Sequence, residues 1–391
     1  MKYDIPLGKP DLTDADREAV LATLQGARLT MGSALLEFEA HLASVVRRPF
    51  AIGVSSAGAG MEICLRALGI GIGDEVLVPS LSFSSNVNSV ISVGATPIFV
   101  DCDARTLNMN VVHAESKVSA KTRAVIGVPV LGNPAGLPEL IAFCSRFEIP
   151  MVEHAAEGLG STIGSDNVGK FGRLSVFGFG PNRPIASGEG GAIVTHDDRL
   201  AAACRALRNQ GRVDRQSFPN QSQDLGMLMA FSGMGYDARL AEPLAALASS
   251  QLRRLDEIRS QRLEIAAAYT RALGGHPDLI LPNVLENSQI CWPLFWVRLS
   301  DRFGAHDRDA LIDGLHRHDI GAANHYPPSH LLPHVQKMFG TKIGDCPTAE
   351  SIGDRMLTLP MYTSMRAREV GQVCQALEIV LARAGIERSS S

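Results

Sequence analysis

The sequence lacks the features that mark several whole classes of protein. It contains no apolar run of about 18 residues or more, so no membrane-spanning helix is predicted. Its N-terminal segment turns acidic and proline-broken without an apolar core, which argues against a secretory signal. It has no basic run and a net charge of −4, so we expect no binding to nucleic acid or to an anionic membrane.

Cysteine is sparse and scattered. The seven cysteines are odd in number, widely spaced and include no Cys-x-x-Cys pair. Disulfide frameworks and zinc sites use even numbers or close pairs of ligands. We therefore predict buried free thiols, a cytoplasmic location and no metal centre.

What the chain does contain is an alternation of short apolar runs and longer helical patterns. Strand-like runs separated by helical segments indicate βαβ units and a mostly parallel sheet. The runs do not alternate apolar with polar residues, as is typical when both faces of a sheet are covered. The predicted strands are residues 50–54, 75–79, 96–101, 124–130 and 150–154, with helices over 58–68, 86–93 and 137–147.

The 391 residues are enough for about two domains. A capping-box-like start at Thr13 and Asp16 predicts a helix that Gly26 ends. Residues 239–273 are apolar at helical spacing and predict one long helix, followed by a strand at 292–299 and further helices. We therefore expect an N-terminal arm and helix over residues 1–30, a large α/β domain over 31–245, and a small α+β domain over 246–391.

Two stretches place polar groups beside predicted strand ends. The helix that opens at Ala57 and Gly58 would offer unpaired backbone N–H groups to an anion, although a plain tight turn explains the same residues. His154 and Glu157 follow a buried strand, where ligands sit in open α/β sheets. A histidine in this place is either a functional group or a satisfied structural one.

Three further stretches are candidates. Arg183, in the loop FGFGPNRPIASGEGG, either clamps an anion with its fork of donors or forms an ordinary ion pair. Asp237 and Arg239 stand at a predicted helix start, where helix capping and a surface ion pair are the plain explanation. His325 and Tyr326 begin the proline-rich loop HYPPSHLLP, whose two histidines are only a weak metal signal.

These stretches occur in the order and spacing of one known family. From about residue 7 to about residue 381 the chain resembles the DegT/StrS-type sugar aminotransferases, which are fold-type I pyridoxal phosphate enzymes. The landmarks are GDEVLVPSLSFSSNVNSVISVGATPIFVD (73–101), LGNPAGLPEL (131–140), GEGGAIVT (188–195) and TLPMY (358–362). The resemblance implies a three-layer, aspartate-aminotransferase-like α/β domain with a mixed, mostly parallel sheet. It also implies a small C-terminal α+β domain and a homodimer with shared active sites.

The resemblance also assigns cofactor positions, and most of them have changed. Arg183 stands where the family has the imine-forming lysine, and His154 where an aspartate pairs with the pyridinium nitrogen. Arginine offers no neutral amine and is a poor base at neutral pH, so it cannot form the imine. Histidine in the aspartate's place removes the negative partner that keeps the ring an electron sink.

The phosphate and ring contacts differ as well. Ala57 and Gly58 replace a Gly-Thr pair that holds the cofactor phosphate, and Asp237 replaces an asparagine that reaches over from the partner subunit. Glu157 replaces a glutamine near the ring hydroxyl, whereas Phe83 keeps the aromatic cover of the ring. We expect that no cofactor is used in the usual way.

The leading hypothesis is acid–base chemistry without pyridoxal phosphate, such as an elimination, isomerisation or cyclisation of a small sugar-like or polyketide-like molecule. His154 and Glu157 would act as acid or base, with Glu157 raising the basicity of His154. Arg183 would clamp an anion, and His325 and Tyr326 would contribute from the neighbouring loop. The alternatives are a dehydratase or aminotransferase-like enzyme that binds pyridoxamine or pyridoxal phosphate non-covalently and acts on a nucleotide-linked keto-sugar, and a non-catalytic partner protein.

Overall fold

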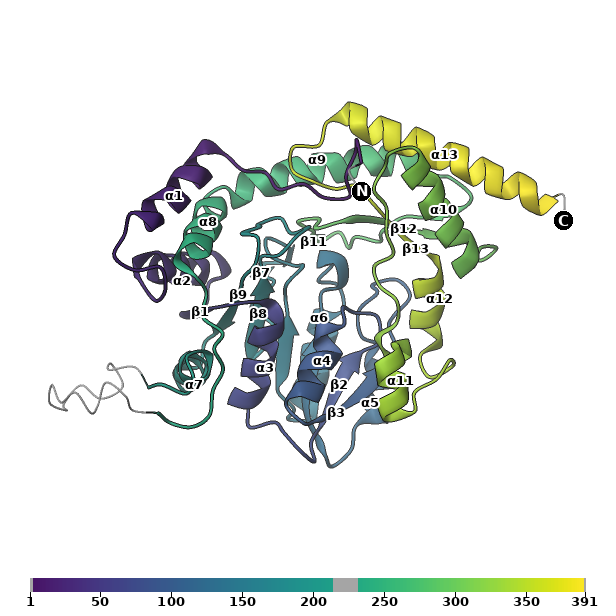
Figure 1. Cartoon of the computed structure of the whole chain (residues 1–391). Helices are drawn as coiled ribbons and strands as arrows, with labels where there is room; N and C mark the ends of the chain where they lie inside the picture. Colours follow the sequence, from purple (N-terminus) through teal and green to yellow (C-terminus); the bar gives the residue numbers. More distant parts are fainter. Residues whose placement is uncertain (1–2, 214–230, 390–391) are drawn as a thin grey trace, which may run out of the picture.

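A computed structural model describes residues 3–213 and 231–389 of the chain, with side chains described up to residue 383. Within these residues, seven strands form one sheet in the order β1-β9-β8-β5-β4-β2-β3 (Figure 1). β9 runs antiparallel to both of its neighbours, and the strands from β8 to β3 are parallel. The strands are β1 Phe50–Val54, β2 Glu75–Pro79, β3 Thr96–Val100, β4 Thr122–Gly127, β5 Met151–His154, β8 Leu174–Gly178 and β9 Gly191–Thr195.

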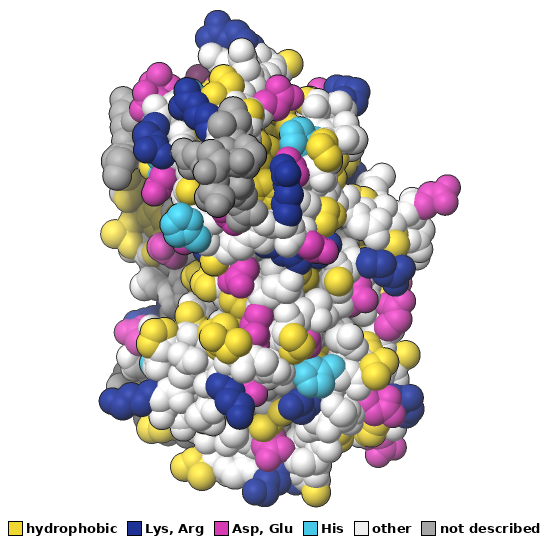
Figure 2. Space-filling model, turned by 90° about the vertical axis from the view of Figure 1, so that its right-hand side faces the viewer, with side chains coloured by type: hydrophobic (Ala, Val, Ile, Leu, Met, Phe, Trp, Pro, Cys, Tyr) yellow, Lys and Arg dark blue, Asp and Glu magenta, His cyan; other side chains and the backbone are white. Residues whose placement is uncertain are grey.

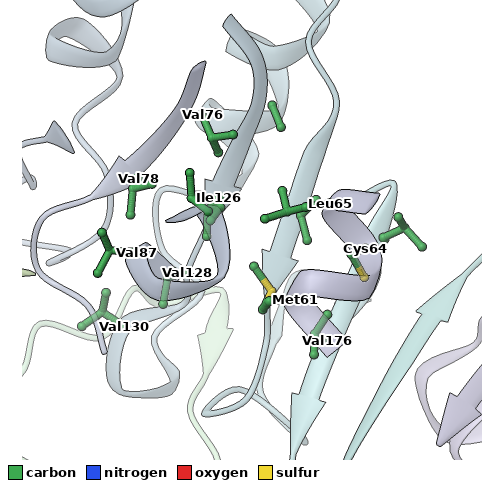
Figure 3. Packing of buried hydrophobic residues seen from close by; sticks show 14 of the residues in the cluster. Met61, Cys64, Leu65, Val76, Val78, Val87, Ile126, Val128, Val130 and Val176 are labelled. Carbon is green, nitrogen blue, oxygen red and sulfur yellow. The ribbon is translucent and has the colours of Figure 1, made fainter. Parts of the chain in front are cut away.

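Helices cover both faces of this sheet, as the unbroken apolar runs predict. On β2, Val76 and Val78 belong to one buried cluster and Leu77, between them, belongs to another. The first cluster includes residues of α3 (Ala57–Ala67), α4 (Ser85–Ser92) and α7 (Asp198–Arg208). Figure 3 shows Met61 and Leu65 of α3 packed towards the valines of the strands. The opposite face is covered by α2 (Ser33–Val46), α5 (Val111–Lys117), α6 (Leu137–Arg146) and α8 (Glu242–Leu252).

The C-terminal part forms a second layered unit. Three antiparallel strands, in the order β10-β12-β13, pack with α9, α10 and α13, and α9 and α13 run along the top of Figure 1. Ile5 joins the same cluster, and its N–H donates to the Asp319 carbonyl at 3.1 Å. The elements here are α9 Leu255–Leu273, β10 Leu279–Ile280, β12 Phe295–Leu299, α10 Ala305–Arg317, α11 Pro333–Phe339, α12 Pro347–Arg355, β13 Met356–Leu359 and α13 Ala367–Ser389. The domain boundary at residue 246 stays a prediction.

Smaller elements complete the described chain. The capping box predicted at Thr13 and Asp16 is confirmed, and α1 spans Asp14–Leu24. A small sheet has the order β11-β6-β7. Its strands are β6 Thr162–Ile163, β7 Asp166–Asn167 and β11 Ser288–Gln289, and two 3-10 turns are η1 Val130–Gly132 and η4 Ser329–Leu331.

The single helix predicted over residues 239–273 is wrong, because α8 ends at Leu252 and α9 begins at Leu255. The break lies beside the N-terminal segment. The side-chain amide of Gln251 donates to the Asp11 carbonyl at 2.9 Å, and the Arg254 guanidinium donates to the Asp11 carboxylate at 2.8 Å. The turn between the helices lets both side chains reach this one residue, which the local helical pattern does not reveal.

Two carboxylates join distant parts of the chain by capping helices. Glu242 accepts hydrogen bonds from the N–H groups of Gly32 and Ala34, both at 2.8 Å, at the start of α2. Asp101, directly after β3, accepts from the N–H groups of Thr348 and Ala349 at the start of α12, at 3.0 and 2.8 Å. A negative side chain is stabilised there by the unpaired N–H groups and the positive end of the helix dipole.

The prediction of buried free thiols is confirmed. All seven cysteines are free and buried. On the face drawn in Figure 2, side chains of both charge signs are interspersed, with no basic stripe in that view. Among the described residues, no helix is both long and apolar enough to span a membrane, and no group of three or more metal-ligating side chains is found.

Candidate active site

Three segments that are far apart in the sequence bring charged and aromatic side chains together. His154 is the last residue of β5, and Glu157 lies in the turn that follows it. Arg183 lies in the loop between β8 and β9, and His325 and Tyr326 lie in the loop after α10. Because β5 and β8 are parallel neighbours, their carboxyl ends place the first two segments side by side.

Glu157 is the centre of the cluster. Its Oε1 accepts from Arg183 Nη1 at 3.1 Å and from the hydroxyl of Tyr326. Its Oε2 accepts from the N–H of Leu131 at 2.7 Å, and Leu131 has a positive φ of 54°. The side chains of Glu157 and Arg183 are 5% and 16% exposed, so the pair is largely shielded from water. One carboxylate therefore holds three donors from three segments.

The charges of this cluster fix the protonation of its members. Burial is the largest single effect and lowers the pKa of Arg183, but Glu157 and Tyr326 together outweigh it, and the pKa is raised. Burial and the same carboxylate raise the pKa of Tyr326 well above its usual value. Arg183 therefore remains a cation, and Tyr326 remains a neutral hydrogen-bond donor.

His154 is buried and uncharged. Its Nε2 is sealed from solvent and has no hydrogen-bond partner among the described residues. Burial lowers its pKa to about 4, while Glu157 acts in the opposite direction and Arg183 adds to the lowering. Glu157 acts on the pKa of His154 in the expected direction, but burial lowers that pKa by more, and Glu157 is bonded to Arg183 and Tyr326 instead of to His154.

His325 and Phe83 flank Tyr326. The rings of His325 and Tyr326 lie 5.0 Å apart, centre to centre, and Phe83 meets Tyr326 edge to face at 5.7 Å. His325 Nδ1 is 2.8 Å from the hydroxyl oxygen of Thr358 in β13. Burial lowers the pKa of His325, with Glu157 and Arg183 acting in opposite directions. Phe83 is about half exposed, so it borders the accessible side of the cluster.

The remaining predicted positions lie around this cluster. Ala57 and Gly58 are the first residues of α3, and the Ser56 hydroxyl caps the helix by accepting from the N–H of Ala59 at 3.1 Å. Asp237 pairs with Arg239 at 2.7 Å, as the plain explanation predicts, but it caps no helix because α8 begins at Glu242. No described hydrogen bond or ion pair joins these residues to Glu157 or Arg183.

Two contacts of the cluster escaped sequence reasoning. The N–H of Leu131 is a backbone donor, which no residue type signals, although it lies in the landmark LGNPAGLPEL. Thr358 begins the landmark TLPMY, but a lone threonine in an apolar strand gives no sign of a contact with His325. Five surface hollows are lined by described residues, and none of these five includes a residue of the cluster.

Comparison with solved structures defines the class. An aminotransferase, TlmJ from Streptoalloteichus hindustanus, has a TM-score of 0.87 at 27% identity, over 97% of this chain and 99% of that chain. S. venezuelae DesV, solved in complex with a ketimine intermediate, has a TM-score of 0.86 at 30% identity, over 97% and 99% of the two chains. With its seven-stranded mixed sheet and small antiparallel C-terminal sheet, the chain has the fold-type I aminotransferase fold.

The family follows from the sequence matches. Residues 10–378 match the model of the DegT/DnrJ/EryC1/StrS aminotransferase family. The spore coat polysaccharide biosynthesis protein SpsC of Bacillus subtilis is 32% identical over 383 residues, which is 97% of each chain. The chain belongs to the DegT/DnrJ/EryC1/StrS aminotransferase family.

Proposed function

We propose that this chain is an enzyme of sugar biosynthesis that acts on a small sugar-like substrate and forms no imine between its own side chain and pyridoxal phosphate. The observation that carries this proposal is the ion pair of Arg183 with Glu157, at 3.1 Å. By the sequence resemblance, position 183 is that of the imine lysine, and a guanidinium offers no neutral amine. Family membership and the polysaccharide-biosynthesis name of SpsC support a sugar-like substrate.

The residues present do not fit a covalently held pyridoxal phosphate. The raised pKa of Arg183 keeps it charged, and His154 is a neutral imidazole where a carboxylate would have to balance a pyridinium. By the sequence resemblance, Gly178 stands where the family has a serine; a Cβ there would lie 3.1 Å from the Cβ of Ala57, so a serine would crowd the start of α3. We therefore derive no step through a covalent cofactor.

The chemistry that these side chains support is proton transfer beside a fixed cation. Glu157, which is held by three donors, serves as the anchor of the cluster. Arg183 contacts Glu157 and the Tyr326 hydroxyl, and the guanidinium has five N–H donors, so further N–H groups remain for a substrate oxygen. An elimination, isomerisation or cyclisation requires such a cation and one group that takes and returns a proton.

A second candidate is an enzyme that binds pyridoxamine phosphate without a covalent bond. It is favoured by the unpartnered Nε2 of His154, since a neutral imidazole can hydrogen-bond a ring nitrogen. The backbone N–H groups of Ala57 and Gly58 would hold the phosphate, and Phe83 would cover the ring. The likeness to DesV, solved with a ketimine intermediate, supports this version. When bound, the cofactor would supply an amine and an electron sink.

Titration of the purified protein separates these cases. Pyridoxal phosphate and pyridoxamine phosphate are added in turn, binding is followed by calorimetry and absorbance, and borohydride-reduced samples are mapped by mass spectrometry. We expect no covalent adduct on the native chain and an adduct at position 183 in Arg183→Lys, which serves as the positive control. A stoichiometric adduct on a lysine of the native chain would overturn the proposal.

The same titration chooses between the two versions. Saturable binding of pyridoxamine phosphate that weakens in His154→Asn supports the cofactor-dependent version, and absence of binding supports the cofactor-free one. The homodimer with shared sites stays a prediction, which light scattering of the same samples tests.

A further inference from the structure

The Thr358 hydroxyl lies between a carbonyl and a histidine. Its Oγ1 is 2.6 Å from the carbonyl oxygen of Ala323 and 2.8 Å from His325 Nδ1. Thr358 is fully buried in β13, and its own N–H donates to the same carbonyl at 2.8 Å. The hydroxyl is therefore held in place by the strand and by the segment that carries His325.

These distances determine where the hydrogen atoms lie. A carbonyl oxygen only accepts, so the single hydroxyl hydrogen of Thr358 must point at Ala323. The hydroxyl oxygen can then only accept from His325, and the ring must carry its hydrogen on Nδ1. In the neutral ring this leaves a lone pair on Nε2.

The two histidines of the site differ in access. The Nε2 of His154 is sealed from solvent, whereas that of His325 is not among the sealed, unpaired atoms of the described chain. His325 has no described hydrogen bond through Nε2, and the residue is partly but not fully buried. The lone pair of His325 is therefore free to meet a molecule that enters beside Tyr326.

We propose that His325 Nε2 is the proton acceptor of this site and that Thr358 is the positioning residue that holds His325 as the Nδ1–H tautomer. This inference deepens the cofactor-free version of the proposed function and rests on it. It moves the base from His154, which was expected to act with Glu157, to His325. His154 remains the buried neutral neighbour.

The proton step balances within the site. A C–H bond next to a substrate carbonyl breaks and an Nε2–H bond forms, which makes His325 an imidazolium. The electron pair moves to the carbonyl oxygen, where the free N–H groups of Arg183 can receive it. Glu157, Arg183 and Tyr326 face His325, and the Glu157 carboxylate lies near enough to favour the imidazolium electrostatically.

The tautomer can be measured without a substrate. We would label the full-length protein with ¹⁵N-histidine, read the protonation of each ring nitrogen by NMR, and assign His325 from the signals lost in His325→Gln. The native protein should show Nδ1 protonated and Nε2 bare. Thr358→Val should shift the tautomer ratio by about fivefold towards Nε2–H, the factor that one net hydrogen bond supports, and Thr358→Ser should restore the native pattern.

A matched control guards against simple misfolding. Thr195 is equally buried, and its hydroxyl donates to the Arg173 carbonyl at 2.8 Å but forms no described hydrogen bond with a histidine. Thr195→Val should therefore leave the His325 signals unchanged. Thermal unfolding of all variants checks that they fold. A native His325 protonated on Nε2, or a Thr358→Val spectrum identical to the native one, would refute the inference.

A second measurement uses chemical reactivity. Diethyl pyrocarbonate acylates the bare nitrogen of an accessible neutral imidazole, so mass spectrometry should find His325 modified and His154 spared. Modification of His325 should be slower in Thr358→Val, by at most about fivefold, because the fraction of rings with a bare Nε2 falls. Faster labelling of His154 than of His325 would contradict the assignment. Neither the NMR nor the labelling experiment involves a cofactor. A negative result in either would refute the role of His325 without deciding the borohydride test of the proposed function.

Discussion

Replacing Glu157 by glutamine is the sharpest test of the Arg183–Glu157 pair, because the shape is kept and the charge is removed. Removing one partner of a buried ion pair costs about 3 to 5 kcal/mol, since the other charge is left without compensation. Arg183 keeps 16% of its side chain exposed, which allows some hydration. We therefore take the lower end, about 3 kcal/mol, as the expected loss of unfolding free energy.

The loss should appear as a lower melting temperature. An unfolding entropy of about 2.1 cal/mol/K per residue gives about 0.8 kcal/mol/K for 391 residues, so about 3 kcal/mol corresponds to about 4 °C. Scanning calorimetry at pH 7 and one protein concentration measures this shift. In a double-mutant cycle with Arg183→Met, the second substitution should recover part of the loss, with a coupling of about 1 kcal/mol or more.

An exposed pair supplies the control. Glu115 pairs with Arg146 at 2.7 Å, but the two side chains are 49% and 56% exposed. Glu115→Gln should therefore cost less than about 1 kcal/mol, or about 1 °C. The reasoning fails if Glu157→Gln and Glu115→Gln have the same melting temperature. It also fails if the losses of unfolding free energy caused by the Glu157 and Arg183 substitutions add without coupling.

Three further outcomes follow from the geometry. The pKa of His154 in the folded chain is lowered to about 4, so the unfolded chain takes up a proton first as the pH falls. Urea unfolding should therefore show up to about 3 kcal/mol of stability lost between pH 6.5 and pH 4. In His154→Asn this part of the pH dependence should vanish, and an unchanged dependence would contradict the assignment. A Cβ on Gly191 would lie 2.8 Å from the backbone nitrogen of Ala57, so Gly191→Ala should lower the denaturant midpoint by the equivalent of about 1 to 3 kcal/mol. A Cβ on Gly371, within α13, would meet open space, so Gly371→Ala should raise the unfolding free energy by about 0.5 to 1 kcal/mol. Asp101→Ala should lower the unfolding free energy by about 1 to 2 kcal/mol and speed amide hydrogen exchange in the first turn of α12. Unaltered exchange there would show that the Asp101 cap does not stabilise the helix.

The central sheet could be predicted closely because its signal is local. β1 and β2 begin and end at the predicted residues, since each is an unbroken apolar run bounded by turn residues. β5 ends at His154 as expected, so the candidate site lies at the strand end that the sequence pattern predicts. The fold-type I architecture, implied by the landmarks, is confirmed by the solved relatives.

What escaped prediction depends on contacts between distant residues. α2 begins after Gly32 without a capping side chain of its own, because Glu242 supplies the carboxylate from α8. At the break between α8 and α9, Gln251 and Arg254 both donate to Asp11, more than 200 residues away in the sequence. A sequence window that covers only the helix contains neither partner.

The same reason limited the prediction of the site. Glu157 and Arg183 could be named as candidates, but not as partners of each other. The direction of the pKa shift of His154 depends on its degree of burial, which the residue type does not reveal. The proposed tautomer of His325 depends on Thr358, which lies 33 residues away in the sequence.

The link from Asp101 to α12 has a mechanical consequence. The first turn of α12 is bonded to the end of β3, although α12 belongs to the C-terminal third of the chain. An opening that separates these two parts must break both hydrogen bonds, so we expect α12 to be one of the links that carry force from the C-terminal part to the central sheet. In a single-molecule pulling experiment, the two parts should then yield as one unit in the native protein and in two steps in Asp101→Ala.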